Sequence, residues 1–416
     1  MNRIHAIVIC LGLVACQPLP SHPGSSPNPM PSKTVSPVQS SALPSFAPSP
    51  TSSASLIEPE FSSPPFSANG ITITPFAGSR TRGYKDGPAL DAQFGNTIGK
   101  PCQDSRGNLY IPDRTYLRKL SVEGGVSTVA GTADAGFRDG LALEAQFNFI
   151  NSCAVDSKGN IYLADFSNLR VRKLSPDGIV STFAGTGMPG YADGPADQAS
   201  FQSVKNVLLD EKNNRLLVYV YNSLREIDLT TGIVKTVFEQ RYQESPTGTF
   251  TGFKDGPLNR YLDTDSSLDL TLDPATSTLY LLDRDNHGLR SFKDNVLFTL
   301  AGGARYRQYT DGQGKDAYFA QPNDLAFEPE RKLIFMMDHS GIRLVSLEGR
   351  VRTLALPGQQ GIDIFPINVI LNGSQFLYLK SKNELLIIPG DSPIYTFNAL
   401  FYKVTLPDGP LPELKL

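Results

Sequence analysis

Beyond residue 70 the chain is a succession of short apolar runs separated by Gly, Asn, Asp and Pro. In the clearest stretch, an apolar run ends at Asp156 and Ser157–Asn160 makes a tight turn. Three further runs follow over Ile161–Ala164, Val171–Leu174 and Ile179–Ala184. Short apolar runs bounded by turn residues predict β-strands, and no segment shows the sustained period of about 3.6 residues expected of an amphipathic helix. The local unit is therefore four strands.

This unit recurs, and an Asp-Gly pair marks five copies at spacings of 53, 54, 62 and 56 residues. The pairs begin at Asp86, Asp139, Asp193, Asp255 and Asp311. An aromatic residue stands two positions before each of them: Tyr84, Phe137, Tyr191, Phe253 and Tyr309. Four copies also carry a Phe eight positions after the Asp, namely Phe94, Phe147, Phe201 and Phe319. A four-stranded unit with this period predicts the blade of a β-propeller, which buries its faces only against neighbouring blades.

The number of blades that the pattern supports is six. Five begin near Ile98, Ile150, Val204, Leu268 and Asp324. The sixth is assigned to Phe365–Leu371, Gln375–Leu379 and Leu385–Ile388. Its fourth strand is either Ile71–Phe76 or Ile394–Phe397, and the sequence leaves both open. We therefore expect an all-β, six-bladed β-propeller of four-stranded blades over residues 70–400, followed by a C-terminal tail over residues 401–416.

The first fifteen residues have the pattern of an export signal. A short cation-bearing start precedes an apolar run from Ile4 to Ala15, which is too short to span a bilayer as a helix. The ending Leu13-Val14-Ala15-Cys16 resembles the bacterial lipobox, which is cleaved before a cysteine that receives lipid. The resemblance implies a signal peptide over residues 1–15, lipidation of Cys16 and export to the cell envelope, with the outer membrane or cell surface favoured. An ordinary cleaved signal is the alternative.

Residues 16–69 are predicted to be a disordered tether. The stretch from 17 to 66 holds 13 Pro and 14 Ser among 50 residues, and its charges are confined to Lys33, Glu58 and Glu60. Such a segment buries too little apolar surface to offset its conformational entropy.

Composition and charge exclude one broad class of partner. Lys and Arg total 38 against 41 Asp and Glu, which leaves a formal net charge of −3. A nucleic-acid-binding protein needs a clustered excess of cations, so we expect no nucleic-acid partner.

The motifs resemble those of the NHL-repeat family of six-bladed propellers. The matching residues are Gly185, Gly190, Asp193-Gly194 and Phe201, together with Asp156, Gly159-Asn160, Tyr162, Asp165 and Asn168. The resemblance implies that the links from strand four to the next strand one lie on the same face as those from strand two to three. Because the first kind is long, as at Gly131–Phe149, we expect any binding site on this long-loop face.

Four aspartates that follow second strands are candidate binding residues on that face: Asp113, Asp165, Asp283 and Asp338. Together they could hold Ca²⁺, which takes six to eight oxygens. The alternative, which the repetition favours, is that each carboxylate accepts hydrogen bonds from its own loop. The Asp-Gly pairs invite the same interpretation, with the Gly supplying a positive φ. No resident metal or cofactor is therefore predicted, and Ca²⁺ is kept only as a possibility.

His287 and His339 occupy equivalent loops of blades four and five and are further candidate binding residues. They are the only histidines in the folded region, which excludes a three-His zinc site. No Gly-x-Ser-x-Gly elbow or phosphate loop is present, and no catalytic residue is assigned.

Cys102 and Cys153 lie in the first strands of adjacent blades. They stand two and three positions before the strand-ending Asp, so their side chains are expected to point opposite ways. We expect buried free thiols, with a disulfide as the alternative that export allows.

The sequence predicts a cell-envelope lipoprotein whose propeller binds a protein or glycan on its long-loop face. Besides the aspartates and His287, the repeat aromatics are candidate contacts, although we expect these rings to wedge between blades. The alternative is a metal-dependent hydrolase or lyase resembling the gluconolactonase branch of six-bladed propellers. That branch holds an ion such as Ca²⁺ with Glu, Asn and Asp in the channel. Here the first strands offer Gln103, Asn151 and Asn206 and no Glu.

Overall fold

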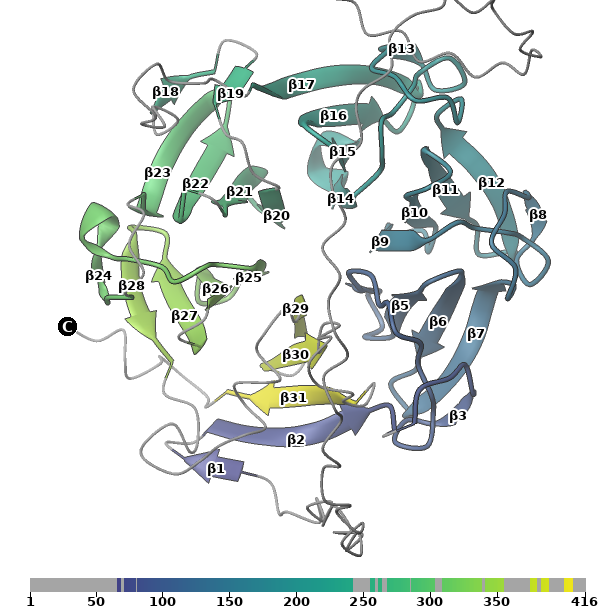
Figure 1. The fold of residues 1–416 in the computed structure, drawn as a ribbon, viewed down its shortest axis with the longest axis horizontal. Helices are drawn as coiled ribbons and strands as arrows, with labels where there is room; N and C mark the ends of the chain where they lie inside the picture. Colours follow the sequence, from purple (N-terminus) through teal and green to yellow (C-terminus); the bar gives the residue numbers. More distant parts are fainter. Residues whose placement is uncertain are drawn as a thin grey trace, which may run out of the picture. The chain divides into compact units, whose positions relative to one another are not determined.

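The computed structural model describes residues 66–68, 71–79, 81–241, 255–258, 261–263, 268–284, 286–303, 309–338, 341–354, 375–379, 383–388 and 400–406. In these ranges the chain is all β, apart from two single-turn 3₁₀ helices, η1 (Glu211–Asn213) and η2 (Gly314–Asp316). The strands form six sheets arranged around a centre, which confirms the predicted six-bladed β-propeller (Figure 1). No helix among the described residues is long and apolar enough to cross a membrane.

Each blade is one antiparallel sheet, and five of the six share one strand order. Blade one contains β4 (Cys102–Gln103), β5 (Leu109–Asp113), β6 (Tyr116–Leu120), β7 (Gly125–Gly131) and, outermost, β3 (Gly87–Pro88). Blade two contains β9 (Ile150–Val155), β10 (Ile161–Asp165), β11 (Arg170–Leu174), β12 (Ile179–Ala184) and β8 (Gly140–Leu141). Blade three contains β14 (Asn206–Asp210), β15 (Arg215–Val220), β16 (Ser223–Asp228), β17 (Ile233–Arg241) and β13 (Gly194–Pro195), and β19 (Tyr261–Asp263) pairs in parallel with β17.

Blades four and five follow the same order. Blade four contains β20 (Leu268–Asp273), β21 (Thr278–Asp283), β22 (Gly288–Lys293), β23 (Val296–Gly302) and β18 (Gly256–Pro257). Blade five contains β25 (Asp324–Glu328), β26 (Leu333–Asp338), β27 (Gly341–Ser346), β28 (Arg350–Thr353) and β24 (Gly312–Gln313).

Blade six is completed by the N-terminal part of the propeller. It contains β29 (Gln375–Leu379), β30 (Glu384–Ile388), β31 (Phe401–Thr405), β2 (Ile71–Ala77) and β1 (Phe66–Ala68). Of the two open alternatives, Ile71–Phe76 is thus the closing strand, because β2 pairs with β31. Residues 365–371 and 394–397 lie outside the described residues. Phe401–Thr405, which we placed in the C-terminal tail, is instead the third strand of this blade.

The Asp-Gly pairs add a fifth strand that the four-strand prediction missed. The Gly of each pair begins a two-residue strand that pairs with the outer strand of its blade, as β8 does with β12. This extra strand covers part of an edge that would otherwise expose unpaired N–H and C=O groups. Gly87, Gly140, Gly194 and Gly256 have φ between 125° and 142°, which confirms the predicted positive φ at those four pairs.

The core lies between the blades. Ile161 and Leu163 of β10 pack against blade one, whereas Tyr162 and Ala164 pack against blade three. Because both faces of the strand are covered, it reads as a continuous apolar run rather than an alternating one. The Phe of each repeat, such as Phe147, is fully buried in this interface.

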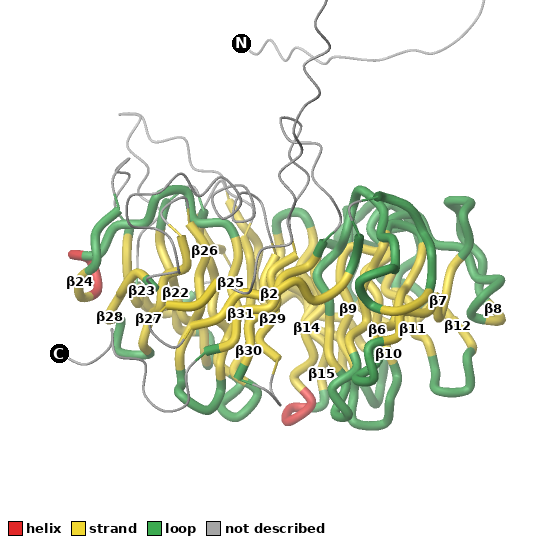
Figure 2. The backbone as a smooth tube through the Cα atoms, turned by 90° about the horizontal axis from the view of Figure 1, so that it is seen from below, coloured by secondary structure: helices red, strands yellow, loops and turns green. Residues whose placement is uncertain are grey.

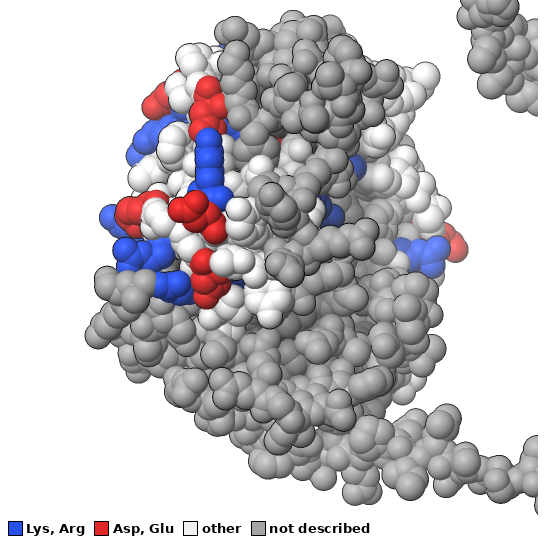
Figure 3. All heavy atoms as spheres, turned by 60° about the vertical axis from the view of Figure 1, so that its left-hand side comes forward, with Lys and Arg blue, Asp and Glu red and all other residues white. Residues whose placement is uncertain are grey.

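The strands of all blades run between two loop faces (Figure 2). The long link before β9 and the link from β10 to β11 lie on one face, since the Ile150 N–H donates to the Arg114 carbonyl and the Phe166 N–H to the Phe149 carbonyl. This is the predicted long-loop face. The other, formed by turns such as Ser175–Gly178, is called the short-turn face. Figure 3 shows Lys and Arg interspersed with Asp and Glu on the part of this side that the structure describes.

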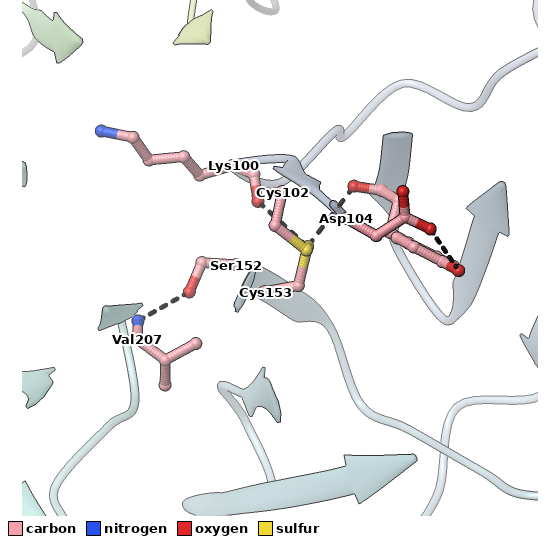
Figure 4. Close-up of a disulfide and its surroundings, with 7 residues drawn as sticks. Lys100, Cys102, Asp104, Ser152, Cys153 and Val207 are labelled. Carbon is pink, nitrogen blue, oxygen red and sulfur yellow. Dashed lines mark hydrogen bonds between the residues drawn. A yellow bond between two sulfur atoms is a disulfide. The ribbon is translucent and has the colours of Figure 1, made fainter. Parts of the chain in front are cut away.

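Cys102 and Cys153 form a disulfide with Cα atoms 5.5 Å apart (Figure 4), so the expectation of free thiols was wrong. Their side chains do project from opposite faces of their own blades. Cys153 packs toward blade one, while the adjacent Ala154 packs toward blade three. In a ring of blades the front face of one meets the back face of the next, and opposite projection therefore brings these two side chains together.

Candidate functional site

A buried arginine pairs with the Asp-Gly aspartate of its blade and, in blades one, two and five, also with the aspartate at the end of the second strand. The sequence analysis missed this arginine. In blade two, the Arg172 guanidinium donates from Nη1 to Asp165 Oδ2 at 2.7 Å and from Nη2 to Asp139 Oδ1 at 2.5 Å. It also donates to the Gln146 and Arg138 carbonyls at 3.1 and 2.7 Å. Arg172 and Asp165 are both inaccessible to solvent. The guanidinium thus ties the Asp-Gly loop to the end of the second strand.

The same arrangement recurs around the ring. The equivalent ion pairs are Arg118 with Asp113 and Asp86, Arg343 with Asp338 and Asp311, Arg290 with Asp255, and Arg225 with Asp193. In each of these blades the Asp of the Asp-Gly pair also accepts a hydrogen bond from a Thr N–H in the fourth strand, as Asp139 does from Thr182 at 3.0 Å. The sequence does contain a signal for these arginines, because an Arg follows each Asp-Gly aspartate by 32 to 35 positions.

The four candidate aspartates at the ends of second strands lie inside this network. Each of Asp113, Asp165 and Asp338 accepts a backbone N–H from the preceding long loop and pairs with its blade's arginine. Asp283 accepts a hydrogen bond from Asn286 Nδ2 at 2.9 Å. These contacts agree with the alternative interpretation, in which the aspartates stabilise the loops rather than bind a ligand. All four side chains are buried. A ligand-binding role for them stays a prediction.

Burial affects the pKa of two of these carboxylates, Asp113 and Asp165. Burial raises the pKa of Asp113 to about 6, although the Gly95 N–H and the Arg118 guanidinium both oppose the change. Burial likewise raises the pKa of Asp165. Asp86 is less buried, and there the Thr128 N–H and Arg118 outweigh burial and lower the pKa. In blades one, two and five, each guanidinium therefore joins one desolvated carboxylate to one more accessible carboxylate.

Of the two candidate histidines, the structure describes only His287. His287 is half-buried, with a φ of 52°, and its Nδ1 lies 2.8 Å from the Phe319 carbonyl oxygen. His339 lies outside the described residues. The described residues contain no group of three or more His, Cys, Asp or Glu side chains placed to hold a metal ion.

The repeat aromatics are not the interblade wedges that we expected. Tyr84, Phe137, Tyr191 and Tyr309 are 43 to 55% exposed, and Phe253 lies outside the described residues. The wedges are the other repeat residues, Phe94, Phe147, Phe201 and Phe319, all of which are fully buried. The exposed set lies over the ion pairs, with the Arg172 guanidinium carbon 4.8 Å from the Phe137 ring centre and that of Arg343 5.9 Å from the Tyr309 ring centre. We call these four side chains the aromatic rim.

The channel contains a layer of polar side chains, one from the same position of each first strand. Its described members, four residues before the Asp or Glu that ends or follows the strand, are Lys100, Ser152, Asn206, Asp269 and Asp324. We call this set the channel layer. Sequence analysis identified only Asn206, because each member is a single polar residue that looks unremarkable within its own copy.

Lys100 crosses the channel to the opposite blades. Its Nζ lies 2.9 and 3.0 Å from the two carboxylate oxygens of Asp269 in blade four, and 3.0 Å from Asp324 Oδ1 in blade five. Figure 4 shows its side chain extending away from the disulfide. Burial opposes both charges, but the two carboxylates raise the pKa of Lys100 and its ammonium helps to lower that of Asp269. Lys100 and Asp269 are therefore both charged at neutral pH.

Polar side chains of the first strands also form hydrogen bonds with neighbouring blades. Ser152 Oγ accepts the Val207 N–H at 2.9 Å, and Asp269 Oδ2 accepts the Leu325 N–H at 2.8 Å. Asn151 Nδ2 donates to the Lys205 carbonyl at 2.5 Å. Asn151, a candidate of the enzyme alternative, thus binds the next blade.

The channel does not fit a Ca²⁺ ion of the kind that the enzyme alternative requires. Such an ion takes six to eight oxygens. In the described channel the carboxylates of Asp269 and Asp324 are directed at the Lys100 ammonium, which already supplies the positive charge between them. The described residues therefore favour an internal ammonium over an added cation.

Two cavities stand out in the described structure. One, of about 210 Å³, lies in the channel beneath Lys100 and is walled mainly by apolar residues of all six blades, including Val207, Leu270, Ala326 and Leu377. The other, of about 370 Å³, lies between blades three and four near the short-turn face. The prediction that binding sites belong only to the long-loop face does not account for either.

No family model matches the chain. Among curated proteins, it is 25% identical over 364 residues to Protein SUPPRESSOR OF QUENCHING 1, chloroplastic, of Arabidopsis thaliana. That match covers 81% of this chain and 33% of the relative, so the chain spans about a third of the relative's length.

Several solved structures have a similar fold. A Bacteroides thetaiotaomicron protein of unknown function superposes with a TM-score of 0.56 at 18% identity, covering 80% of this chain and 76% of that one. Two auxiliary nutrient binding proteins follow. The one from Bacteroides thetaiotaomicron has a TM-score of 0.54 at 15% identity, with coverages of 80% and 76%. The one from Bacteroides ovatus has a TM-score of 0.55 at 14% identity, with coverages of 81% and 76%. At these identities the likeness establishes the fold: the chain contains a six-bladed β-propeller.

Proposed function

We propose that this protein is a cell-envelope lipoprotein, anchored through lipid on Cys16, whose propeller binds a protein or glycan partner on its long-loop face. The observation that carries the proposal is the aromatic rim. Aromatic residues are enriched where partners bind, and four of them are about half exposed at equivalent positions of the repeat.

The rim is held in place before any partner arrives. The guanidinium carbons of Arg170 and Arg172 lie 3.9 and 4.8 Å from the Phe137 ring centre. The Tyr84 ring centre lies 4.9 Å from that of Tyr116. Rigid aromatic side chains lose little conformational entropy on binding, which makes them effective anchors. A flat ring can also stack on the apolar face of a sugar, so the same surface suits a glycan.

Fold-level analogy agrees with a binding role. Two of the solved structures with TM-scores above 0.5 are auxiliary nutrient binding proteins. The lipobox-like Cys16 and the Pro/Ser-rich residues 17–66 suit a module displayed away from a membrane.

The binding role is tested by replacing the rim. A variant with Tyr84, Phe137, Tyr191 and Tyr309 changed to Ala should lose at least tenfold in affinity for the partner recovered from envelope extracts or a glycan array. In the matched control, Ala replaces Val122, Ile179 and Val296. These three side chains are similarly exposed but lie on the short-turn side. Equal binding by both variants, with melting temperatures close to that of the unaltered protein, would disprove the role of the rim.

The anchor is tested separately in a bacterial host. Metabolic labelling with an alkyne fatty acid should label the full chain and not the Cys16→Ser variant. An unlabelled parent chain would refute lipidation without touching the binding role.

A further inference from the structure

Blade three lacks an aromatic side chain that the other well-described blades share. Near the start of the second strand, at positions that have equivalent partners in the first strand, blades one, two, four and five carry Tyr110, Tyr162, Tyr280 and Phe335. Each of these pairs with the first-strand residue two positions before the acidic residue that ends or follows that strand. In blade three, Leu217 pairs with Leu208, two positions before Asp210, and therefore occupies the aromatic position.

The aromatic residue fills the space toward the next blade. In blade two the Tyr162 ring centre lies 5.0 Å from that of Phe183, and Lys173 Nζ lies 5.9 Å from the Tyr162 ring centre. Blade three has smaller residues, Leu217 and Val237, at the positions that Tyr162 and Phe183 occupy in blade two. Val237 follows Thr236 as Phe183 follows Thr182, and both threonines bond to the aspartate of the Asp-Gly pair.

The facing blade restores only part of the missing volume. Phe292 of blade four stands where blade two has Leu174, two residues after the buried arginine, and its ring centre lies 5.5 Å from that of Phe238. A cavity of about 370 Å³ remains between the two blades, with Leu217, Leu224, Leu279 and Phe292 among its apolar lining residues. This volume lies within the range of small-molecule sites, about 300–1,000 Å³.

The mouth of this cavity is cationic. Lys212, Arg215 and Lys293 line it, and among the described lining residues only Asp294 is acidic. Arg215 is paired with Asp210 and Glu226, so its charge is largely compensated. Lys212 and Lys293 are exposed, and Lys212 donates to the Ala275 carbonyl at 2.6 Å.

We propose that the cavity between blades three and four is a binding site for a small amphipathic anion, with an apolar body against Leu217 and Phe292 and an anionic head at Lys212 and Lys293. Asn213 and Asn295 also line the cavity, but their amide nitrogens already donate to Asp210 and to the Leu258 carbonyl, so the two lysines are the main partners of the head. The site lies on the short-turn side, away from the aromatic rim, and so does not depend on the partner-binding role proposed above.

The probe for this site is 8-anilinonaphthalene-1-sulfonate, which combines an aromatic body with a sulfonate. The folded protein should bind it at one saturable site, followed by fluorescence. Leu217→Tyr, which copies the other blades, should weaken binding at least tenfold without lowering the melting temperature. Val237→Phe, which copies blade two, is a second filling variant should the first fail to fold. Undiminished binding by a folded filling variant, or no saturable binding by the parent protein, would overturn the proposal.

Charge is tested with a paired probe. Lys212→Glu/Lys293→Glu should weaken binding of the sulfonate about fivefold or more and leave binding of the neutral N-phenyl-1-naphthylamine unchanged. Lys158→Glu, an exposed lysine in the equivalent turn of blade two, is the matched control and should change neither. Equal weakening of both probes by the double variant would disprove the anionic head.

Discussion

Lys100 and Asp269 form an ion pair across the centre of the ring although they stand 169 positions apart in the sequence. Lys100 belongs to blade one and Asp269 to blade four, and Asp324 of blade five completes the cluster at 3.0 Å. The cluster links three blades that share no sheet, so it stabilises the closed ring rather than any one blade.

Lys100→Met should therefore destabilise the ring in a pH-dependent way. Removing one partner of a buried ion pair typically costs about 3–5 kcal/mol. In the parent protein the depressed pKa of Asp269 contributes stability above pH about 4, which is lost as the pH falls through the folded pKa. In the variant two carboxylates face each other without a cation, so the pKa of the pair rises and stability falls as the pH increases.

The measurement is denaturant unfolding at pH 4.5 and 7.5, with Lys158→Met as an exposed control. The loss caused by Lys100→Met should be greater at pH 7.5. A loss that is equal at both pH values would contradict the assignment of the cluster as an ion pair.

Arg172→Ala should be among the most destabilising single changes in blade two. The substitution leaves the fully buried Asp165 carboxylate without its cation and frees the Gln146 and Arg138 carbonyls, so a loss of about 3–5 kcal/mol in the free energy of unfolding is expected. Arg172→Lys should recover little, because an ammonium cannot reproduce the planar fork that serves both aspartates. Denaturation midpoints test this against Lys173→Ala, which should lose less than about 1 kcal/mol. Similar losses for the two Ala variants would show that the network contributes little.

Reduction of the Cys102–Cys153 disulfide should destabilise the propeller by about 2–4 kcal/mol. The bridge closes a loop between residues 51 positions apart, and its loss enlarges the entropy of the unfolded chain. Melting curves with and without dithiothreitol measure the effect, and the Cys102→Ser/Cys153→Ser variant should be indifferent to the reductant. A parent protein equally indifferent to complete reduction would contradict the prediction.

Deletion of the N-terminal strand should open the ring. A chain beginning at residue 79 lacks β2, which exposes the edge of β31 and removes Ile73 and Ala77 from the cores that flank blade six. We expect a fall in melting temperature of at least about 10 °C or failure to fold, because an unpaired edge and uncovered apolar surface both favour unfolding and aggregation. A chain beginning at residue 69 keeps β2 and should melt within a few degrees of the parent. Equal melting of the two truncations would mean that β2 is dispensable.

Local features were readable from the sequence because residues close in the chain determine them. The turns at Ser157–Asn160 and Ser175–Gly178, the strands between them and the positive φ at four of the five Asp-Gly glycines depend on neighbours within one copy. Gly312, in the fifth pair, does not have the predicted positive φ. Repetition then multiplied the signal, which made the six blades predictable. For the fourth strand of blade six the sequence offered two candidates, and one of them, Ile71–Phe76, is the strand that closes the ring.

Two errors came from reasoning about each blade in isolation. Opposite projection of Cys102 and Cys153 argues against a disulfide on one sheet, but it favours one where the front of a blade meets the back of the next. Tyr84 and Phe137 were assigned to wedge positions because they are aromatic and repeated, yet the other repeat aromatics, such as Phe147, already fill the interface.

The sequence by itself determined the positions of turns and the fold class, which follow from patterns within one repeat, and the blade count, which follows from the number of copies along the chain. Only the tertiary structure decided which side chains meet in the channel and between the blades. The pair of Lys100 and Asp324 spans 224 positions, and the cavity bordered by Leu217 depends on which residues of blade four face it. Such contacts exist only once the ring has closed, because closure brings residues on different blades into register.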